Sequence, residues 1–174
     1  MKGEDYDRTK VEELLEKLNS VEWGREGSVA FLVETPEPHR YVVRDRVEVV
    51  AGRGFSGDNA EKSFFKGEYV PGREVSAMAI EVLHILGVEP GVPGDNLITA
   101  GVDLGSLKTG ERMRVGEVIL ERSKNPHRPC MTFRARTSPE AYAVASLTQH
   151  RGALFTVVQG GTIRTKDDVE ILRA

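Results

Sequence analysis

The chain has 174 residues, 39% of them hydrophobic and 29% charged, and its formal net charge is −3. That size fits one domain with a core of its own, and the mild acidity argues against a general nucleic-acid binder, which needs a broad basic face. No apolar run approaches the roughly eighteen residues of a membrane span, and the charged start of the chain has no apolar secretory segment. The single cysteine permits no internal disulfide and suits a reducing compartment, so we expect a cytoplasmic protein.

The first predicted element is an amphipathic helix over residues 9–19. Thr9 and Glu12 have the spacing of a capping box, and the apolar side chains fall on one face: Val11, Leu14, Leu15 and Leu18. We expect this face to pack on the body of the protein or on a second subunit. The chain therefore divides into a helical extension, residues 1–23, and one domain, residues 24–174.

Most of the remaining chain predicts short strands separated by glycine-rich turns. The predicted strands, one of them broken near Gly116, cover residues 28–34, 40–50, 112–121, 153–158 and 168–172. Many short strands with few helices are typical of a closed or nearly closed antiparallel barrel. We therefore predict a mainly β fold, a β-barrel with a few peripheral helices.

Two of those helices lie within the strand-rich part. Residues 75–86 predict a helix with Ser76 as its N-cap and Gly87 as its C-terminal stop. A third helix opens at Ser138, with proline at its first helical position, and runs to about Gln149.

Cys130 lies in a stretch where every formal charge is positive, from Arg122 to Arg136. Nearby cations stabilise a thiolate, and the thiolate is both the nucleophile and the metal ligand in sulfur chemistry. The alternative is a buried cysteine that packs as a small hydrophobe. His127, three residues earlier, is either a proton partner or metal ligand or, as we favour, an exposed loop histidine.

A series of short motifs follows a recognisable order. The motifs are Gly54-Phe-Ser-Gly57-Asp58, Val75-Ser76, Pro93-Gly94-Asp95-Asn96-Leu97, Gly101-Val-Asp-Leu104, Val115-Gly116 and Pro129-Cys130, before a glycine-bounded closing strand pair. Each is common alone, but their order over about residues 24–173 resembles the MOSC domain, named for the C-terminal part of molybdenum cofactor sulfurases. The chain departs from the family pattern in two motifs: Asp95 stands where glutamate is usual, and Asn59-Ala60 replace arginine or leucine followed by histidine.

The resemblance implies a barrel like that of pyruvate kinase and an association with molybdenum and sulfur. Stand-alone members are understood to bind a molybdenum–pyranopterin cofactor, with the cysteine (here Cys130) as metal ligand, and to reduce N-hydroxylated compounds. The chain has no iron–sulfur cysteine cluster and no dinucleotide fingerprint, so such an oxidoreductase needs a separate electron-transfer protein. Sulfurases add a pyridoxal-phosphate domain, and these residues offer no site for pyridoxal phosphate.

Two other functions stay open. Cys130 could carry a persulfide from a sulfur-donor protein to a metal centre, or the chain could hold and deliver the cofactor without turnover. All three functions involve a small-molecule cofactor or substrate, and none requires nucleic acid or a membrane. The sequence leaves open which substrate is used and whether the chain forms a homo-oligomer.

The resemblance also makes loop residues candidates for cofactor binding. In the first loop, Gly57 permits close backbone approach, while Asp58 and Arg53 offer charge. Ser76 is either a helix cap or a ligand contact. The turn at Gly94, Asp95 and Asn96 offers a carboxylate and an amide that could read a pterin edge.

The cationic segment supplies the last candidates. The guanidinium fork of Arg128, Arg134 or Arg136 matches phosphate oxygens, although each is equally well explained as part of a solvated basic edge. On a strand, Arg134 and Arg136 would share a face with Cys130 and Thr132. We therefore predict that these side chains point toward one ligand.

Overall fold

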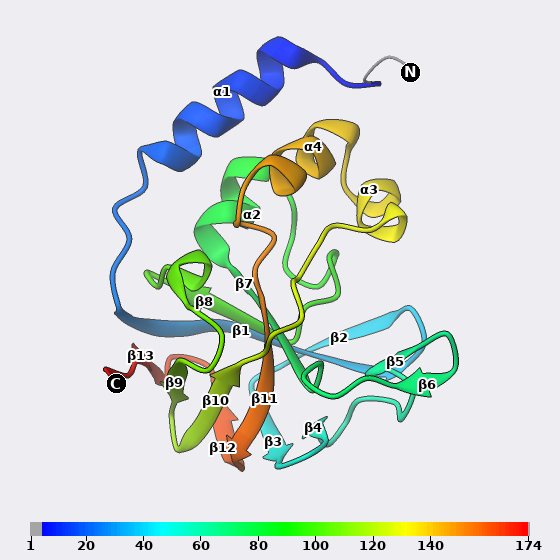
Figure 1. Cartoon of the computed structure of the whole chain (residues 1–174), viewed down its shortest axis with the longest axis vertical. Coiled ribbons are helices and arrows are strands. Elements are labelled where there is room, and N and C mark those ends of the chain that lie inside the picture. The colour runs from blue at the N-terminus through cyan, green and yellow to red at the C-terminus, as the bar shows by residue number, and fades with distance from the viewer. Residues whose placement is uncertain (1–4, 174) are drawn as a thin grey trace.

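Seven strands close into a ring in the part of the chain that the computed structural model describes, residues 5–173 (Figure 1). β1 pairs with β13 and closes the ring, while β2 (Arg40–Arg44) pairs with the C-terminal half of β1. The mainly β barrel that the sequence predicts is therefore confirmed. Around the ring the order is β13 (Asp168–Ile171), β9 (Arg112–Val115), β10 (Val118–Arg122), β11 (Ala153–Gln159), β7 (Val75–Ala79), β8 (Leu97–Ala100) and β1 (Glu26–Glu37).

One pair of neighbours in the ring, β7 and β8, is parallel, and the helix α2 (Ile80–Leu86) connects them. Parallel neighbours need a crossover, and a helix packed on the sheet is the usual one. The barrel is therefore mixed, and the prediction of an antiparallel barrel is wrong at this pair.

The same region corrects the helix predicted over residues 75–86. Its first five residues form β7, so Ser76 is a strand residue and caps no helix. A strand that is buried on both faces is a continuous apolar run, which periodicity cannot distinguish from a buried helix. The predicted stop is confirmed, because Gly87 ends α2 with φ 68°.

Two smaller sheets lie outside the ring. β12 (Gly161–Arg164), β3 (Arg46–Val50) and β4 (Gly54–Phe55) form one, and the hairpin of β5 (Phe64–Phe65) and β6 (Glu68–Tyr69) forms the other. A short 3-10 turn, η1 (Leu104–Ser106), follows β8. The three-stranded sheet packs onto the barrel core through Val47, Val49, Phe55 and Ile163.

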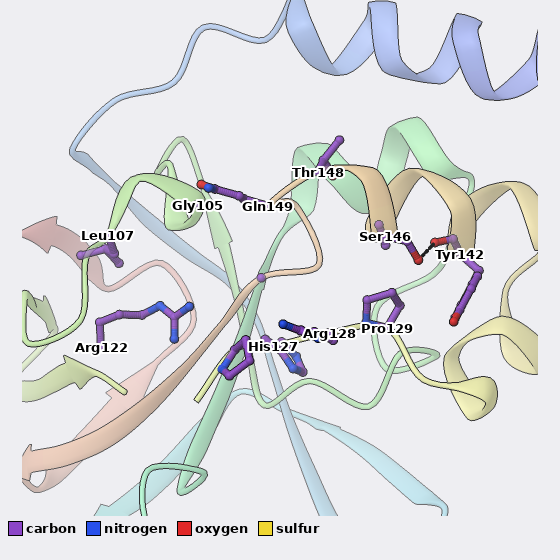
Figure 2. Close-up of a pocket in the computed structure, with 13 residues that line it drawn as sticks. Gly105, Leu107, Arg122, His127, Arg128, Pro129, Tyr142, Ser146, Thr148 and Gln149 are labelled. Atoms are coloured by element: carbon purple, nitrogen blue, oxygen red, sulfur yellow. Dashed lines mark hydrogen bonds between the residues drawn. The ribbon is translucent and has the colours of Figure 1, made fainter. Parts of the chain in front are cut away.

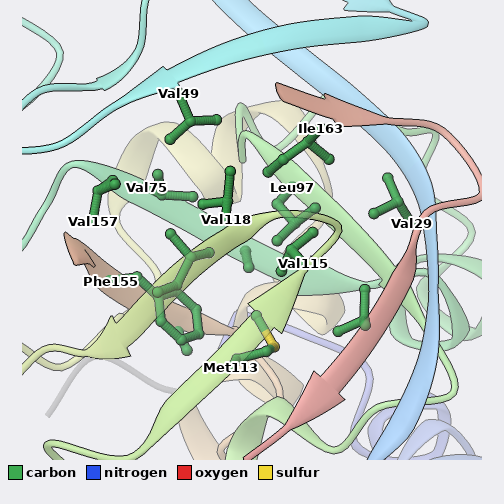
Figure 3. Packing of buried hydrophobic residues seen from close by; sticks show 14 of the residues in the cluster. Val29, Val49, Val75, Leu97, Met113, Val115, Val118, Phe155, Val157 and Ile163 are labelled. Atoms are coloured by element: carbon green, nitrogen blue, oxygen red, sulfur yellow. The ribbon is translucent and has the colours of Figure 1, made fainter. Parts of the chain in front are cut away.

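Aliphatic and aromatic side chains fill the barrel interior (Figure 3). In β9, for example, Met113 and Val115 are buried while Arg112 and Arg114 are exposed, which is the period of two that a strand requires. Each large side chain that is fully buried in this way contributes about 1.5–3 kcal/mol. The filled barrel gives the loops at its end a rigid support.

A second apolar cluster joins four helices to the outer faces of β7 and β8. It combines Met78 and Ile98 from those strands with residues of α1 (Arg8–Asn19), α2, α4 (Pro139–Leu147) and the short helix that contains Phe133. As predicted, α1 buries Val11, Leu14 and Leu18, and Ser138 caps α4. The predicted cap of α1 is wrong: Asp7, and not Thr9, accepts the capping hydrogen bond, from Lys10 N at 3.2 Å. Within residues 5–173, no helix combines the length and apolarity needed to cross a membrane.

The segment predicted as a strand after Cys130 is the short helix α3 (Met131–Arg136). Its sequence, Met-Thr-Phe-Arg-Ala-Arg, consists mostly of good helix formers. Residues two apart on a helix point in different directions, so Arg134 and Arg136 cannot share a face as they would on a strand. The predicted common orientation of the arginines is therefore wrong.

Candidate functional site

The connection between β10 and α3 passes the upper end of the barrel with a hollow on each side. One hollow of about 620 Å³ lies against α4, and a second of about 510 Å³ lies against the β5–β6 hairpin. Pro126, His127 and Arg128 line both hollows, and we call this segment the wall; Figure 2 shows His127 and Arg128 at the first hollow. Cys130 follows directly after the wall.

Cys130 is exposed, which excludes its alternative reading as a buried hydrophobe. Its backbone is extended at the N-cap position of α3, and its Sγ accepts a hydrogen bond from Phe133 N at 3.5 Å. Its neighbour is Tyr41. Burial raises the pKa of Tyr41, the Arg136 cation opposes that effect, and the electrostatic interactions with Asp95 and with Cys130 raise the pKa further. The thiol, this phenol and these two charged groups are therefore within electrostatic range of one another.

We call the surface formed by Cys130, Tyr41, Gly94 and Arg136 the thiol face. The Arg136 guanidinium lies 4.3 Å from the centroid of the Tyr41 ring, and its Nη1 donates to Val92 O at 3.4 Å. Gly94 has φ 82°, and a Cβ there would lie only 2.7 Å from Tyr41 Cε1. Glycine is therefore required at position 94, both for the backbone and for the ring packed on it. A hollow of about 430 Å³ opens beside Tyr41 and Arg136.

Asp95 is buried behind the wall and bonded to two partners. Arg151 Nη1 donates to its Oδ2 at 2.7 Å, and His127 Nε2 donates to its Oδ1 at 2.7 Å. Burial raises the pKa of Asp95, but the Arg151 cation and His127 lower it well below its ordinary value. Arg151 also lies over the Phe133 ring, 4.7 Å from its centroid. Asp95 therefore links the wall to α3.

His127 is not the exposed loop histidine that the sequence favours. Its side chain is only 13% exposed, with Nε2 fixed by Asp95. Burial lowers the pKa of His127, and the Arg151 cation lowers it further, although Asp95 acts in the opposite direction. The imidazole is therefore neutral at pH 7, and its orientation is set by the carboxylate.

Asp58 and Asn96 form a polar hub inside the barrel end. Asp58 accepts hydrogen bonds from Asn96 Nδ2 at 2.9 Å and from Thr35 N at 2.7 Å, and it pairs with Lys62 at 3.2 Å. Asn96 also accepts from Ser76 N and from Lys62 Nζ. The three predicted residues Asp58, Ser76 and Asn96 are thus brought together, but their buried polar groups bond to one another and brace the loops.

The remaining predicted residues are dispersed. Arg53 is exposed and donates to two carbonyls of its own loop, while Gly57 lies against the Glu34 carboxylate, where a Cβ would clash. Thr132 is exposed on α3, and Arg134 pairs with Asp5 near the N-terminus. Of the predicted arginines, only Arg136 belongs to the thiol face and only Arg128 to the wall.

A family model of the MOSC domain matches residues 70–170, which is more than half of the chain. The chain belongs to the MOSC domain family. The solved structure of the YUAD protein from Bacillus subtilis has a TM-score of 0.64 at 23% identity, over 83% of this chain and 94% of that one. YiiM from Geobacillus stearothermophilus has a TM-score of 0.59 at 17% identity, over 85% and 75% of the two chains. YiiM from Escherichia coli has a TM-score of 0.54 at 18% identity, over 84% and 70%.

At these identities the similarity to solved structures shows the MOSC fold alone. No curated protein matches the sequence. Which ligand this MOSC domain binds must therefore be argued from its own residues.

The donor set around Cys130 fits a metal that brings its other ligands with it. Within residues 5–173, no three histidine, cysteine, aspartate or glutamate side chains gather into a site for a bare metal ion. A molybdenum–pyranopterin cofactor carries two dithiolene sulfurs and a phosphate, so it needs one soft protein donor and nearby cations. In this MOSC domain the exposed Cys130 sulfur and the Arg136 guanidinium meet those two needs.

Several residues of this region escape sequence reasoning. The sequence gives Tyr41 the pattern of an ordinary strand residue. Arg151 is an isolated cation in the sequence, 56 positions from Asp95. Lys62 stands in a polar stretch that predicts only a loop. The one usable signal is the run of cations that begins at Arg122, which lines the larger hollow.

Proposed function

We propose that this MOSC protein binds a molybdenum–pyranopterin cofactor through Cys130 and reduces N-hydroxylated compounds with electrons from a separate protein. The observation that carries the proposal is the exposed Cys130 sulfur, the only thiol in the chain, within electrostatic range of the Tyr41 ring on which the Arg136 cation lies. A thiolate is a soft donor of the kind that binds thiophilic metals.

Each side chain of the thiol face has a distinct part in the proposal. Cys130 is the metal ligand, Arg136 faces the anionic edge of the cofactor, and Tyr41 keeps that guanidinium in place through their stacked contact. When bound, the cofactor supplies a two-electron redox couple with open coordination positions. Reducing an N-hydroxyl group to an amine consumes two electrons and two protons and releases water, so an external electron donor is required.

The buried residues support the face from behind. Asp95 fixes His127 and Arg151, and the hub of Asp58 and Asn96 fixes the preceding turn. Buried groups that are hydrogen-bonded in this way are rigid, and rigid support is what a metal ligand needs to keep its orientation. The proposal therefore gives Asp58, Ser76, Asp95 and Asn96 a positioning part and no direct contact with the cofactor.

The test is the metal content of a Cys130→Ser variant that is produced in cells able to make the cofactor. We expect the wild-type chain to copurify with molybdenum and with a pterin that is released on denaturation, and the variant to lose both. Met131→Ala is the matched control, because Met131 is the next residue and is 66% exposed. Full retention of molybdenum by Cys130→Ser would contradict the proposal.

The exposure of Cys130 favours one second candidate, a sulfur carrier. A persulfide must be reached by both its donor and its acceptor, which an exposed thiol allows. In the same preparations, cyanide-labile sulfur on wild-type protein without molybdenum would favour the carrier. Bound cofactor that never turns over with chemical reductant and N-hydroxylated substrate would instead indicate a storage or delivery module.

A further inference from the structure

The larger hollow, on the α4 side of the wall, is built from groups that the thiol face does not use. Its volume of about 620 Å³ is within the range of small-molecule sites. Cys130 does not line it, and neither does any aspartate or glutamate. We call it the Arg122 hollow; its polar and charged lining includes Arg122, His127, Arg128, Tyr142, Ser146 and Gln149 (Figure 2).

Arg122 is held in place without a counter-ion. Its Nη1 donates to the carbonyl oxygens of Ser123 at 2.9 Å, Asn125 at 3.0 Å and Leu154 at 3.4 Å. Within residues 5–173 no carboxylate reaches it, its Nε is buried without a partner, and its Nη2 makes no hydrogen bond. On the neighbouring strand, by contrast, Arg112 is paired with Glu121 at 3.0 Å. The positive charge of Arg122 is therefore uncompensated where it faces the hollow.

Arg128 adds a second cation to the same lining. It is exposed, and in the described part of the chain it has neither an ion pair nor a hydrogen bond. The hydroxyl of Ser146, which donates to Tyr142 O at 2.7 Å, and the amide of Gln149 complete the polar lining. Within residues 5–173 neither of these two guanidinium groups has a counter-ion, and no acid lines the hollow with them, so they match the planar oxygens of a phosphate or a carboxylate.

We infer that the Arg122 hollow binds a small oxyanion, either a phosphate or an organic carboxylate. The fixed Arg122 contributes Nη2, and the exposed Arg128 contributes a second guanidinium from the wall. Cys130 does not line this site and the site needs no metal, so it does not depend on the proposed cofactor function. It would hold the charged end of a substrate or an effector beside the wall that leads to the thiol.

Isothermal titration of the purified full chain tests the inference, with inorganic phosphate and succinate as separate probes at constant ionic strength. Binding of phosphate alone indicates a phosphate site, and binding of succinate alone a carboxylate site; both outcomes support the inference. We expect Arg128→Gln to lower the affinity for the probe that binds roughly tenfold, because the substitution removes one charge-assisted hydrogen bond. Arg122→Gln should weaken it at least as much.

Arg164→Gln is the matched control, since it removes the same charge from an exposed position on β12 outside the hollow. Unchanged affinity of Arg164→Gln for the probe supports a specific site in the Arg122 hollow. A loss of affinity equal to that of Arg128→Gln would show general charge attraction and would overturn the inference. Absence of binding by either probe would also overturn it. If Arg122→Gln fails to fold, Arg128→Gln still decides, because Arg128 is exposed and unpaired within residues 5–173. Cys130→Ser should bind the probe normally, so loss of metal and loss of anion binding remain distinguishable.

Discussion

Asp95 shows how much of this molecule depends on one buried carboxylate. It is 1% exposed, lies in the turn before β8, and holds residues from two other parts of the chain, His127 and Arg151. A buried ion pair contributes little net stability compared with apolar packing. Removing one partner is nevertheless costly, because the other charge then stays buried without a counter-ion. Asp95 is therefore a position where the loss of a single charge should be costly.

We expect Asp95→Asn to lower the free energy of unfolding by about 3–5 kcal/mol at pH 7, because Arg151 then stays buried without its counter-ion. Urea denaturation measures this, with Asp45→Asn as an exposed control.

The same carboxylate makes the stability depend on pH. The pKa of Asp95 is lowered in the folded state, so as pH falls Asp95 is protonated in the unfolded chain at a higher pH than in the folded chain. The stabilisation is therefore complete above about pH 5 and decreases as pH drops below about 4. A difference between wild type and variant that stays constant down to pH 3 would contradict this assignment.

How far single residues could be predicted depends on whether their partners are local. The exposed Cys130 and the cations around it follow from a contiguous stretch of sequence. The pairing of Asp95 with His127 and Arg151 spans 32 and 56 positions, and nothing in the local pattern indicates it. The common face predicted for Arg134 and Arg136 is wrong for another reason: a six-residue helix is too short to show its period in the sequence.

At the scale of elements, the sequence best predicts the strands and helices whose apolar residues recur with a clear period. The alternation in β9 and β10 and the apolar face of α1 are both present as predicted. β7 is the exception, because all five of its residues are buried and leave no polar face to mark it as a strand. β5 and β6, of two residues each, are too short to predict.

α1 provides the second stability prediction, because its apolar face is part of the helical cluster. Leu18 is 2% exposed and packs in the same cluster as residues of α2 and α4. Leu18→Ala should lower the free energy of unfolding by about 2–4 kcal/mol through lost burial and the cavity left behind. Glu13→Ala, on the exposed face of α1, is the control and should change it by less than about 0.5 kcal/mol. An equal, small effect of both substitutions in urea denaturation would mean that α1 contributes nothing to the stability of the barrel.

At the scale of the whole molecule, two apolar clusters share the strands β7 and β8. Leu97 points into the barrel and its neighbour Ile98 into the helical layer, and the same alternation separates Ala77 from Met78. Neither cluster can lose its packing without exposing one face of these strands. The division of the chain into an extension, residues 1–23, and a domain, residues 24–174, stays a prediction that the shared strands make testable.

Trp23, the only tryptophan of the chain, lies at that predicted boundary, so its fluorescence reports on the packing of the helical cluster. It packs against the helical cluster and stacks on His150, with ring centroids 5.4 Å apart. Far-ultraviolet circular dichroism reports instead on the backbone of the whole chain. Because the clusters share β7 and β8, we expect Trp23 fluorescence and circular dichroism to give the same urea midpoint, as a cooperative unit requires. A fluorescence midpoint at clearly lower urea would show that the N-terminal segment and its helices separate first, leaving the barrel folded alone.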